Sequence, residues 1–264
     1  ATLEEPTEGQ VFVDGRSIFE SPYEIRRMMG FMPDHYGTYP DLNVRDYLEF
    51  FARAYEIEPA QRSRRIEQIM DFTGLGKISE KKVEELSKGM RQRLNLGRAL
   101  INDPKILIMD EPAAGLDPRA RIELRFLIKQ LADQGKTIFI SSHILTELAE
   151  ICDHLLVIDK GRMITFGSFQ EIQRAMQKNY EISARLITAE EAPRLERFLL
   201  EHRGVADVRV GENGTISFTF LDPPEQIPAL IRAVMNQGFS LMEFRPEMLS
   251  MEDVFIQITQ GELQ

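Results

Sequence analysis

Two adjacent acids that follow a short apolar run are the strongest chemical signal in the sequence. Asp110 and Glu111 come directly after the run Ile106–Met109, which predicts a buried strand that ends at these acids. Open α/β sheets bind their ligands at the carboxyl ends of parallel strands. One carboxylate there can hold Mg²⁺, and the next can orient or deprotonate an attacking water. Two acids that simply lead into a loop are the alternative for this pattern taken alone.

Three further segments contain residue types that suit phosphate chemistry. Ser87, Lys88 and Gly89 open a predicted helix, whose first N–H groups and dipole favour an anion such as phosphate. Asp117 lies in a Gly-Leu-Asp-Pro turn, and His143 follows another apolar run. Each residue taken alone is also compatible with an ordinary cap, turn or packing role. The functional interpretation therefore depends on their joint order and spacing.

The elements expected to position these residues alternate between short apolar strands and helices. We expect strands at 10–13, 29–32, 106–109 and 137–140, a hairpin at 155–166, and helices at 44–55, 60–72, 88 to about 102, and 120–134. Short strands that are apolar on both sides favour a parallel sheet covered by helices on both faces. We expect the hairpin at an edge of this sheet.

The residue pattern changes after about Lys178. Alternating apolar residues predict strands at 180–186, 208–210, 216–220 and 241–244. Apolar residues at helical spacing predict helices at 195–199 and 227–235. The residues 211–214 (Gly-Glu-Asn-Gly) predict a hairpin. The order β-α-β-β-α-β is typical of a ferredoxin-like α+β domain. Ser250 and Asp253 predict a capping box for a last helix.

The composition of the chain excludes several classes of protein. The 264 residues are 43% hydrophobic and 28% charged, which is ordinary globular usage. A formal charge of −10 argues against a domain held on nucleic acid through phosphates. The one cysteine, Cys152, excludes an intramolecular disulfide framework. No apolar run approaches the roughly 18 residues of a membrane span, so we expect a soluble chain linked to any membrane through a partner.

Four segments in this order resemble motifs of the ATP-binding subunits of ABC transporters. They are Leu86–Arg93 (LSKGMRQR), Ile106–Pro112 (ILIMDEP), Gly115–Asp117 and Ser142–His143. In that family these are the signature motif, the Walker B strand, the D-loop and the switch histidine. The resemblance covers residues 10 to about 173. The remainder is similar to the accessory C-terminal domain of ATPases that serve ABC-2 type exporters.

The resemblance implies that one group of residues acts on the nucleotide bound to the same chain. Asp110 would assist Mg²⁺, Glu111 would polarise the hydrolytic water, and His143 would contact the γ-phosphate of ATP. Asp34 stands where the family usually has glutamine, or often glutamate in exporters of this subclass. Its carboxylate keeps an oxygen ligand for Mg²⁺ but is one methylene shorter than glutamate. A turn aspartate after Pro33 is the alternative for this position.

The resemblance implies that a second group of residues acts on the nucleotide of another subunit. Ser87 and Gly89 would bind the γ-phosphate held by the opposite subunit, and Asp117 would couple the two sites. Lys88 replaces a glycine of the usual signature and adds a positive charge near phosphate, which is electrostatically compatible. Met90 replaces the usual glutamine and removes a side-chain amide.

The family's phosphate loop, G-x-x-x-x-G-K-[ST], does not occur in the sequence. This loop would supply at least four charge-assisted hydrogen bonds to phosphate or metal, each worth about 1.5 kcal/mol. Their loss costs about 6 kcal/mol of binding free energy, or about 10⁴-fold in affinity for ATP. We therefore expect the chain as written to bind ATP weakly. Ala1–Leu3 match the point just after the helix that follows this loop, so we expect an N-terminally truncated form of a normal ATPase. A degenerate subunit that contributes only its signature face is the alternative.

These observations together predict a three-layer, P-loop NTPase-like α/β core followed by a smaller domain. The core is expected over residues 1–177, with a helical subdomain inserted at about 41–100. A small ferredoxin-like α+β domain is expected over 178–264. The loop with Tyr36 and Tyr39 is expected at the junction of core and helical subdomain, where it would carry the hydrolysis signal to a membrane partner.

The predicted function is that of an ATPase subunit that powers an ABC-2 type exporter. The resemblance implies ATP and Mg²⁺ as cofactors and a second ATPase subunit, the same or different, as one partner. The other partner would be an integral membrane permease at the cytoplasmic face of the cell membrane. A soluble ABC protein acting on nucleic acid is the rival. The single core, the absence of heptads and the charge of −10 disfavour it, so no nucleic-acid partner is expected.

Overall fold

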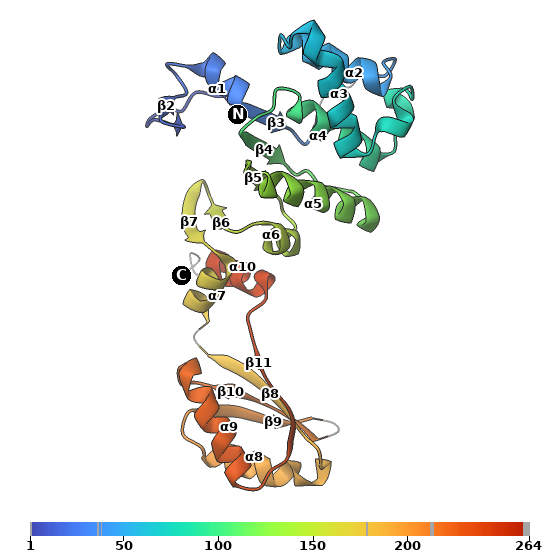
Figure 1. Cartoon of the computed structure of the whole chain (residues 1–264). Coiled ribbons are helices and arrows are strands. Elements are labelled where there is room, and N and C mark those ends of the chain that lie inside the picture. Colours follow the sequence, from blue (N-terminus) through green and yellow to red (C-terminus); the bar gives the residue numbers. More distant parts are fainter. Residues whose placement is uncertain (1, 36, 38, 178, 212–213, 261–264) are drawn as a thin grey trace. The chain divides into compact units, whose positions relative to one another are not determined.

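The computed structural model describes residues 2–35, 37, 39–177, 179–211 and 214–260. The chain forms two compact units, residues 1–147 and 148–264, and each is described by itself. Figure 1 shows the helices and strands of both units in a mixed α/β architecture. No helix in the described residues is long and apolar enough to cross a membrane.

The first unit alternates short strands with helices, as predicted. Its elements are β1 (Phe12–Val13), β2 (Arg16–Ser17), α1 (Pro22–Met28), β3 (Met29–Met32), α2 (Val44–Ala54), α3 (Pro59–Thr73), η1 (Gly76–Ile78), η2 (Val83–Glu85), α4 (Lys88–Leu100), β4 (Ile106–Asp110), α5 (Pro118–Asp133), β5 (Thr137–Ser141) and α6 (Leu145–Ile151). The last of these, α6, continues into the second unit. The strand expected at 10–13 is shorter than predicted and pairs with β2.

Side-chain caps fix where three of these helices begin. Asn43, Ser87 and Asp117 each accept a hydrogen bond from the backbone N–H three residues further on, at the starts of α2, α4 and α5. Such caps satisfy an amide that has no partner inside the helix. The helix α3 ends at Gly74, whose left-handed conformation (φ 67°) favours glycine. The helices predicted at 44–55 and 60–72 are thus confirmed as α2 and α3.

The parallel sheet of the first unit has the strand order β3-β4-β5. Met32 pairs with Met109, and Asp110 pairs with Ser141. Because the strands are parallel and in this register, their carboxyl ends lie side by side at one edge of the sheet (Figure 1). The residues that follow the three strands are therefore brought to the same edge, as the sequence predicts.

One face of this sheet is packed more completely than the other. Helix α4 lies so close to β3 that a Cβ at Gly30 would overlap the Ala99 carbonyl oxygen, and Leu107 on β4 is fully buried. On the opposite face Phe139 of β5 is 56% exposed. In the described residues this side of β5 is therefore less completely covered than the side of the sheet that faces α4.

Helices α2, α3 and α4 pack against one another in the region expected to be helical (Figure 1). Their contact is apolar and almost free of solvent, with Tyr47, Leu48, Ile66 and Leu94 fully buried. Burial raises the pKa of the Tyr47 phenol above its usual value. This group of helices holds the start of α4, where Ser87 lies, in a fixed relation to the sheet.

The second unit contains a hairpin, a helix, an α+β domain and a terminal helix. Its elements are β6 (Leu155–Asp159), β7 (Arg162–Gly167), α7 (Phe169–Met176), β8 (Tyr180–Leu186), η3 (Ala189–Glu191), α8 (Ala192–Glu201), β9 (Val205–Val210), β10 (Thr215–Phe220), η5 (Pro224–Gln226), α9 (Ile227–Asn236), β11 (Leu241–Glu247) and α10 (Met251–Gln260). The four strands β8 to β11 form an antiparallel sheet in the order β11-β8-β10-β9. This confirms the ferredoxin-like order of elements.

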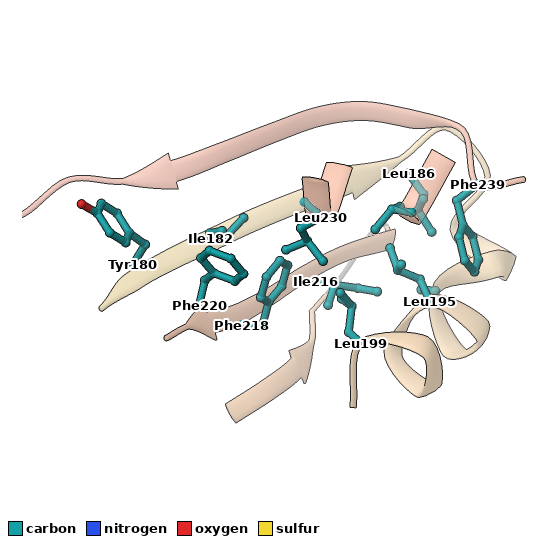
Figure 2. Packing of buried hydrophobic residues seen from close by; sticks show 13 residues of the cluster. Tyr180, Ile182, Leu186, Leu195, Leu199, Ile216, Phe218, Phe220, Leu230 and Phe239 are labelled. Carbon is teal, nitrogen blue, oxygen red and sulfur yellow. The ribbon is translucent and has the colours of Figure 1, made fainter. Parts of the chain in front are cut away.

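The core of this domain comes from alternate residues of the central strands. Figure 2 shows side chains of β8 and β10, among them Ile182, Phe218 and Phe220, gathered with Leu195 of α8 and Leu230 of α9. These side chains are all nearly inaccessible to solvent. The alternation read from the sequence is therefore the buried face of the sheet. The turn residues 212–213 of the predicted hairpin lie outside the described residues.

The hairpin β6–β7 forms a two-stranded sheet of its own. The hairpin expected at 155–166 is confirmed as this pair of antiparallel strands.

Helix α7 packs against α10 and is tied to the C-terminal strand by side-chain hydrogen bonds. Gln173 Nε2 donates to the Leu249 carbonyl oxygen at 2.6 Å, and Gln177 Nε2 donates to that of Glu247 at 2.9 Å. The capping box predicted at the start of α10 is confirmed, since Ser250 and Asp253 exchange hydrogen bonds. The Asp253 N–H donates to Ser250 Oγ at 3.1 Å, and the Ser250 N–H donates to Asp253 Oδ2 at 3.0 Å.

Candidate functional site

The carboxyl ends of β4 and β5 form a hydrogen-bonded group around Asp110. The Ser141 hydroxyl donates to Asp110 Oδ1 at 2.5 Å. The backbone N–H of Glu111 lies 3.2 Å from both the carbonyl and the hydroxyl oxygen of Ser141. These contacts follow from the parallel pairing of Asp110 with Ser141, and they fix the Asp110 carboxylate at the sheet edge. The second oxygen of this carboxylate can accept a ligand.

Glu111 and His143 meet directly beside this group. The His143 Nδ1 lies 2.8 Å from Glu111 Oε2. Glu111 takes a φ of 47°, a left-handed backbone conformation that is uncommon for residues other than glycine and concentrates at functional sites. The Glu111 side chain is 24% exposed and that of His143 is 71% exposed. The His143 ring is therefore open to a ligand, whereas a packing role would have buried it.

Asp34 follows β3 at the same edge but has a different partner. Its Oδ2 lies 2.8 Å from Nδ1 of the exposed His35. In the described residues, no group of three or more His, Cys, Asp or Glu side chains is placed to hold a metal ion. A metal ion held by Asp110 or Asp34 would therefore need further ligands, such as water or phosphate oxygens.

The residues around the start of α4 form a second group. Gly89 lies so close to α5 that a Cβ there would stand 2.8 Å from Ala120 Cβ. The Lys88 Nζ lies over Gly115 and fills the space that a Cβ at residue 115 would occupy. Ser87 accepts a hydrogen bond from the backbone of α4 and remains exposed. The start of α4 and the turn before Asp117 are thus packed together within one chain.

Two buried amides of α4 connect the first group with the second. Gln92 Nε2 donates to the Pro112 carbonyl oxygen at 2.8 Å, just beyond Glu111. Asn95 Nδ2 donates to the Pro33 carbonyl oxygen at 3.3 Å, just before Asp34. The two amides are three positions apart, so they lie on one side of the helix. Neither amide was predicted as a site residue from the sequence, although polar residues at helical spacing were the available signal.

Ser141 was also missed as a site residue. The sequence places it directly after an apolar run, and Asp110 directly after another. Pairing those two predicted strands in parallel would have put the hydroxyl beside the carboxylate. The distance of 2.5 Å between Ser141 Oγ and Asp110 Oδ1 shows that the strand register alone brings the two side chains together.

The donor set fits a hydrated Mg²⁺ that arrives with phosphate oxygens. Mg²⁺ prefers oxygen ligands and is usually held by one or two carboxylates together with waters and substrate phosphates. Asp110, fixed by the hydroxyl of Ser141, supplies a carboxylate oxygen at the sheet edge. The residues present therefore suit part of a magnesium–nucleotide site.

Two family profiles match most of the chain. A profile described as "ABC transporter" matches residues 1–114. A second, described as "ATP-binding protein DrrA1-3-like, C-terminal domain", matches residues 167–259. The two profiles cover the parallel sheet through β4 and the ferredoxin-like domain with its flanking helices.

Several relatives are similar to this chain, two of them over nearly its whole length. The Nod factor export ATP-binding protein I of Ralstonia nicotianae is 30% identical over 98% of this chain and 79% of its own length. The bacitracin transport ATP-binding protein BcrA of Bacillus licheniformis is 31% identical over 98% of this chain and 82% of its own length. The Nod factor export ATP-binding protein I of Cupriavidus metallidurans is 38% identical, and the aligned region covers 64% of this chain and 56% of that relative.

A solved structure supports the same assignment. The structure titled "Structure of ATP binding subunit of ABC transporter" aligns with a TM-score of 0.58 and 28% identity, over 66% of this chain and 72% of that one. The chain belongs to the family of ABC transporter ATP-binding proteins. The fold expected from the sequence is confirmed by these matches together with the parallel sheet.

Proposed function

We propose that the protein is the ATP-binding and ATP-hydrolysing subunit of an ABC-2 type exporter. The single observation that carries this proposal is the group formed by Asp110, Ser141, Glu111 and His143 at the ends of adjacent parallel strands. The relatives named for Nod factor export and bacitracin transport support an export role. We further propose that the core extends over residues 1–177 and the accessory domain over 178–264.

The chain's own residues would divide the chemistry as follows. ATP with Mg²⁺ supplies the phosphoryl group and the charge neutralisation that its transfer requires. Asp110, fixed by Ser141, would hold an oxygen position of the metal shell. Glu111 would accept a hydrogen bond from the attacking water and orient it. With Nδ1 engaged by Glu111, the exposed edge of His143 would present Nε2 to the γ-phosphate.

We propose that the signature group serves the nucleotide of a second ATPase subunit. Ser87 and Gly89 lie at the N-terminus of a helix, where unpaired N–H groups and the helix dipole favour phosphate. Lys88 adds a cation at the same helix end. Asp117 begins the neighbouring helix and would meet the other subunit across the interface. The partner is a second copy of this chain or a related ATPase.

An aromatic cluster near the Asp34 loop supports contact with a membrane permease. Tyr39 packs 5.0 Å from Phe50 and 6.4 Å from Tyr47 between ring centroids. Tyr39 and Phe50 are exposed, so the cluster presents apolar surface beside the loop that follows β3. Tyr36, the other tyrosine singled out in this loop, lies outside the described residues. We propose that this surface receives the permease at the cytoplasmic face of the membrane.

The test is to purify the full-length gene product with its permease and to measure ATP hydrolysis and export together. The proposal predicts Mg²⁺-dependent hydrolysis that falls by about 10²-fold or more in E111Q, with ATP binding retained. Y39A should lower export while hydrolysis persists. Co-purification with ribosomes or DNA in place of a membrane protein would favour the rival function on nucleic acid.

A further inference from the structure

One arginine in the first unit joins the segments that carry Asp117 and His143. Arg121, in the first turn of α5, pairs through Nε with Glu147 Oε1 at 2.7 Å. Its Nη2 donates to the Leu116 carbonyl oxygen at 3.3 Å. A single guanidinium group therefore contacts the loop just before Asp117 and the helix just after His143.

The burial of Glu147 makes its ion pair with Arg121 hard to replace. The Glu147 side chain is 6% exposed and that of Arg121 is 31% exposed. A carboxylate this deeply buried is costly to leave without a charged partner, so Glu147 keeps Arg121 in place. The planar guanidinium holds its N–H groups in fixed directions, so Nη2 donates to Leu116 while Nε lies in the ion pair with Glu147, whereas a lysine ammonium acts as a point charge. Neither residue belongs to the groups assigned above to metal, water or phosphate.

The two ends of this connection lie next to residues of the proposed chemistry. The Arg121 N–H donates to the Asp117 carbonyl oxygen at 3.0 Å, so the arginine also belongs to the turn that Asp117 begins. Glu147 lies in the first turn of α6, and His143 precedes this helix by two residues. His143 in turn contacts Glu111 at 2.8 Å. The Asp117 loop is therefore joined by contacts to Glu147, and from there to His143 by the short stretch of chain at the start of α6.

We propose that Arg121 and Glu147 are positioning residues that couple the Gly115–Asp117 loop to His143 within one chain. Contact of a second subunit with Asp117 then sets where the His143 ring stands against Glu111. This inference rests on the proposed function, because the ATPase dimer supplies the contact on Asp117. It adds a route inside the chain to the coupling expected across the dimer interface.

The connection itself can be tested without nucleotide, by hydrogen–deuterium exchange on the chain. In E147Q, which keeps the size of the side chain but removes its charge, we expect faster exchange in the distant residues 115–117 as well as in α6. R121K keeps the charge facing Glu147 but loses the second donor, and should also raise exchange in residues 115–117. The control is R119Q, two residues away on α5, where an exposed arginine pairs with Glu123 of the same helix. Faster exchange in E147Q confined to α6 would overturn the proposal.

The functional consequence is measured as a split between kcat and KM in the full-length ATPase. E147Q should lower kcat per folded molecule by about 2- to 30-fold, with the KM for ATP changed less than about twofold. R119Q should match the wild type in both. If E147Q folds poorly, E147D weakens the pair with the charge retained and should show a smaller fall in kcat. A kcat per folded molecule equal to that of the wild type would overturn the proposal, whereas absence of hydrolysis in the wild type would refute the proposed function instead.

Discussion

Gly89 is close enough to α5 for its missing side chain to be tested directly. A Cβ at this position would stand 2.8 Å from Ala120 Cβ, well inside ordinary contact, so G89A must push α4 and α5 apart. Overpacking of this kind costs about 1–3 kcal/mol. Alanine is also a better helix former than glycine by about 1 kcal/mol, which offsets part of the loss in the single variant.

A double-mutant cycle with A120G separates these two effects. A120G removes the opposing methyl group, while the propensity difference at residue 89 is the same in both backgrounds and cancels. We therefore expect G89A to be about 1–3 kcal/mol less unfavourable when residue 120 is glycine. The same cycle in the ATPase assay tells packing from phosphate binding. G89A/A120G should recover stability but not turnover if the added methyl group at residue 89 also obstructs phosphate bound at this helix end.

The assay needs a probe for the first unit, because the chain contains no tryptophan and has two units that can unfold separately. F126W places a fluorophore at an exposed position of α5 and serves as the common background. Urea unfolding of the four variants then gives the coupling energy. Additivity within about 0.5 kcal/mol would refute the close approach of α4 to α5.

Three further predictions concern stability. Q92L leaves the Pro112 carbonyl without its buried donor and should destabilise the first unit by about 1–3 kcal/mol in urea unfolding, with the exposed Q61L as the neutral control. The Lys136 ammonium and, secondarily, Arg65 hold the pKa of Asp103 below its ordinary value, so the stability it contributes is present above about pH 4 and is lost as pH falls through its folded pKa. The free energy of unfolding of the wild type should exceed that of D103N by less than about 1 kcal/mol at pH 7, because the Asp103 side chain is largely exposed. This difference should vanish in acid, and a difference that stays constant with pH would contradict the prediction. F218A empties a fully buried position of the ferredoxin-like domain and should cost about 3–5 kcal/mol by circular dichroism, while in the F126W background the tryptophan fluorescence of the first unit stays unchanged.

The strands and the residues that end them were predictable because local patterns decide them. Short apolar runs stopped by acids, serine or glycine mark β4 and β5, and the alternation from Tyr180 to Leu186 marks the buried face of β8. Parallel pairing then brings the ends of those strands together. Parallel pairing of β4 with β5 also places Glu111 near His143, but their contact is seen only in the structure.

What the sequence did not reveal depends on contacts between distant segments. Gln92 and Asn95 are polar residues of a helix, and such residues usually face solvent, yet both are buried against backbone carbonyl groups. The exposure of Phe139 follows from which elements surround β5, not from the apolar pattern of the strand itself. The same holds for the pair of Arg121 and Glu147, which lie 26 positions apart along the chain.

The central claim is that one nucleotide lies between Glu111 of one subunit and Ser87 of another. Mixing two inactive full-length variants, E111Q and S87R, tests it most directly. A mixed dimer then contains one site with both residues intact, so a 1:1 mixture should recover up to about a quarter of the wild-type ATP hydrolysis. Activity no higher than that of either variant alone would contradict the claim.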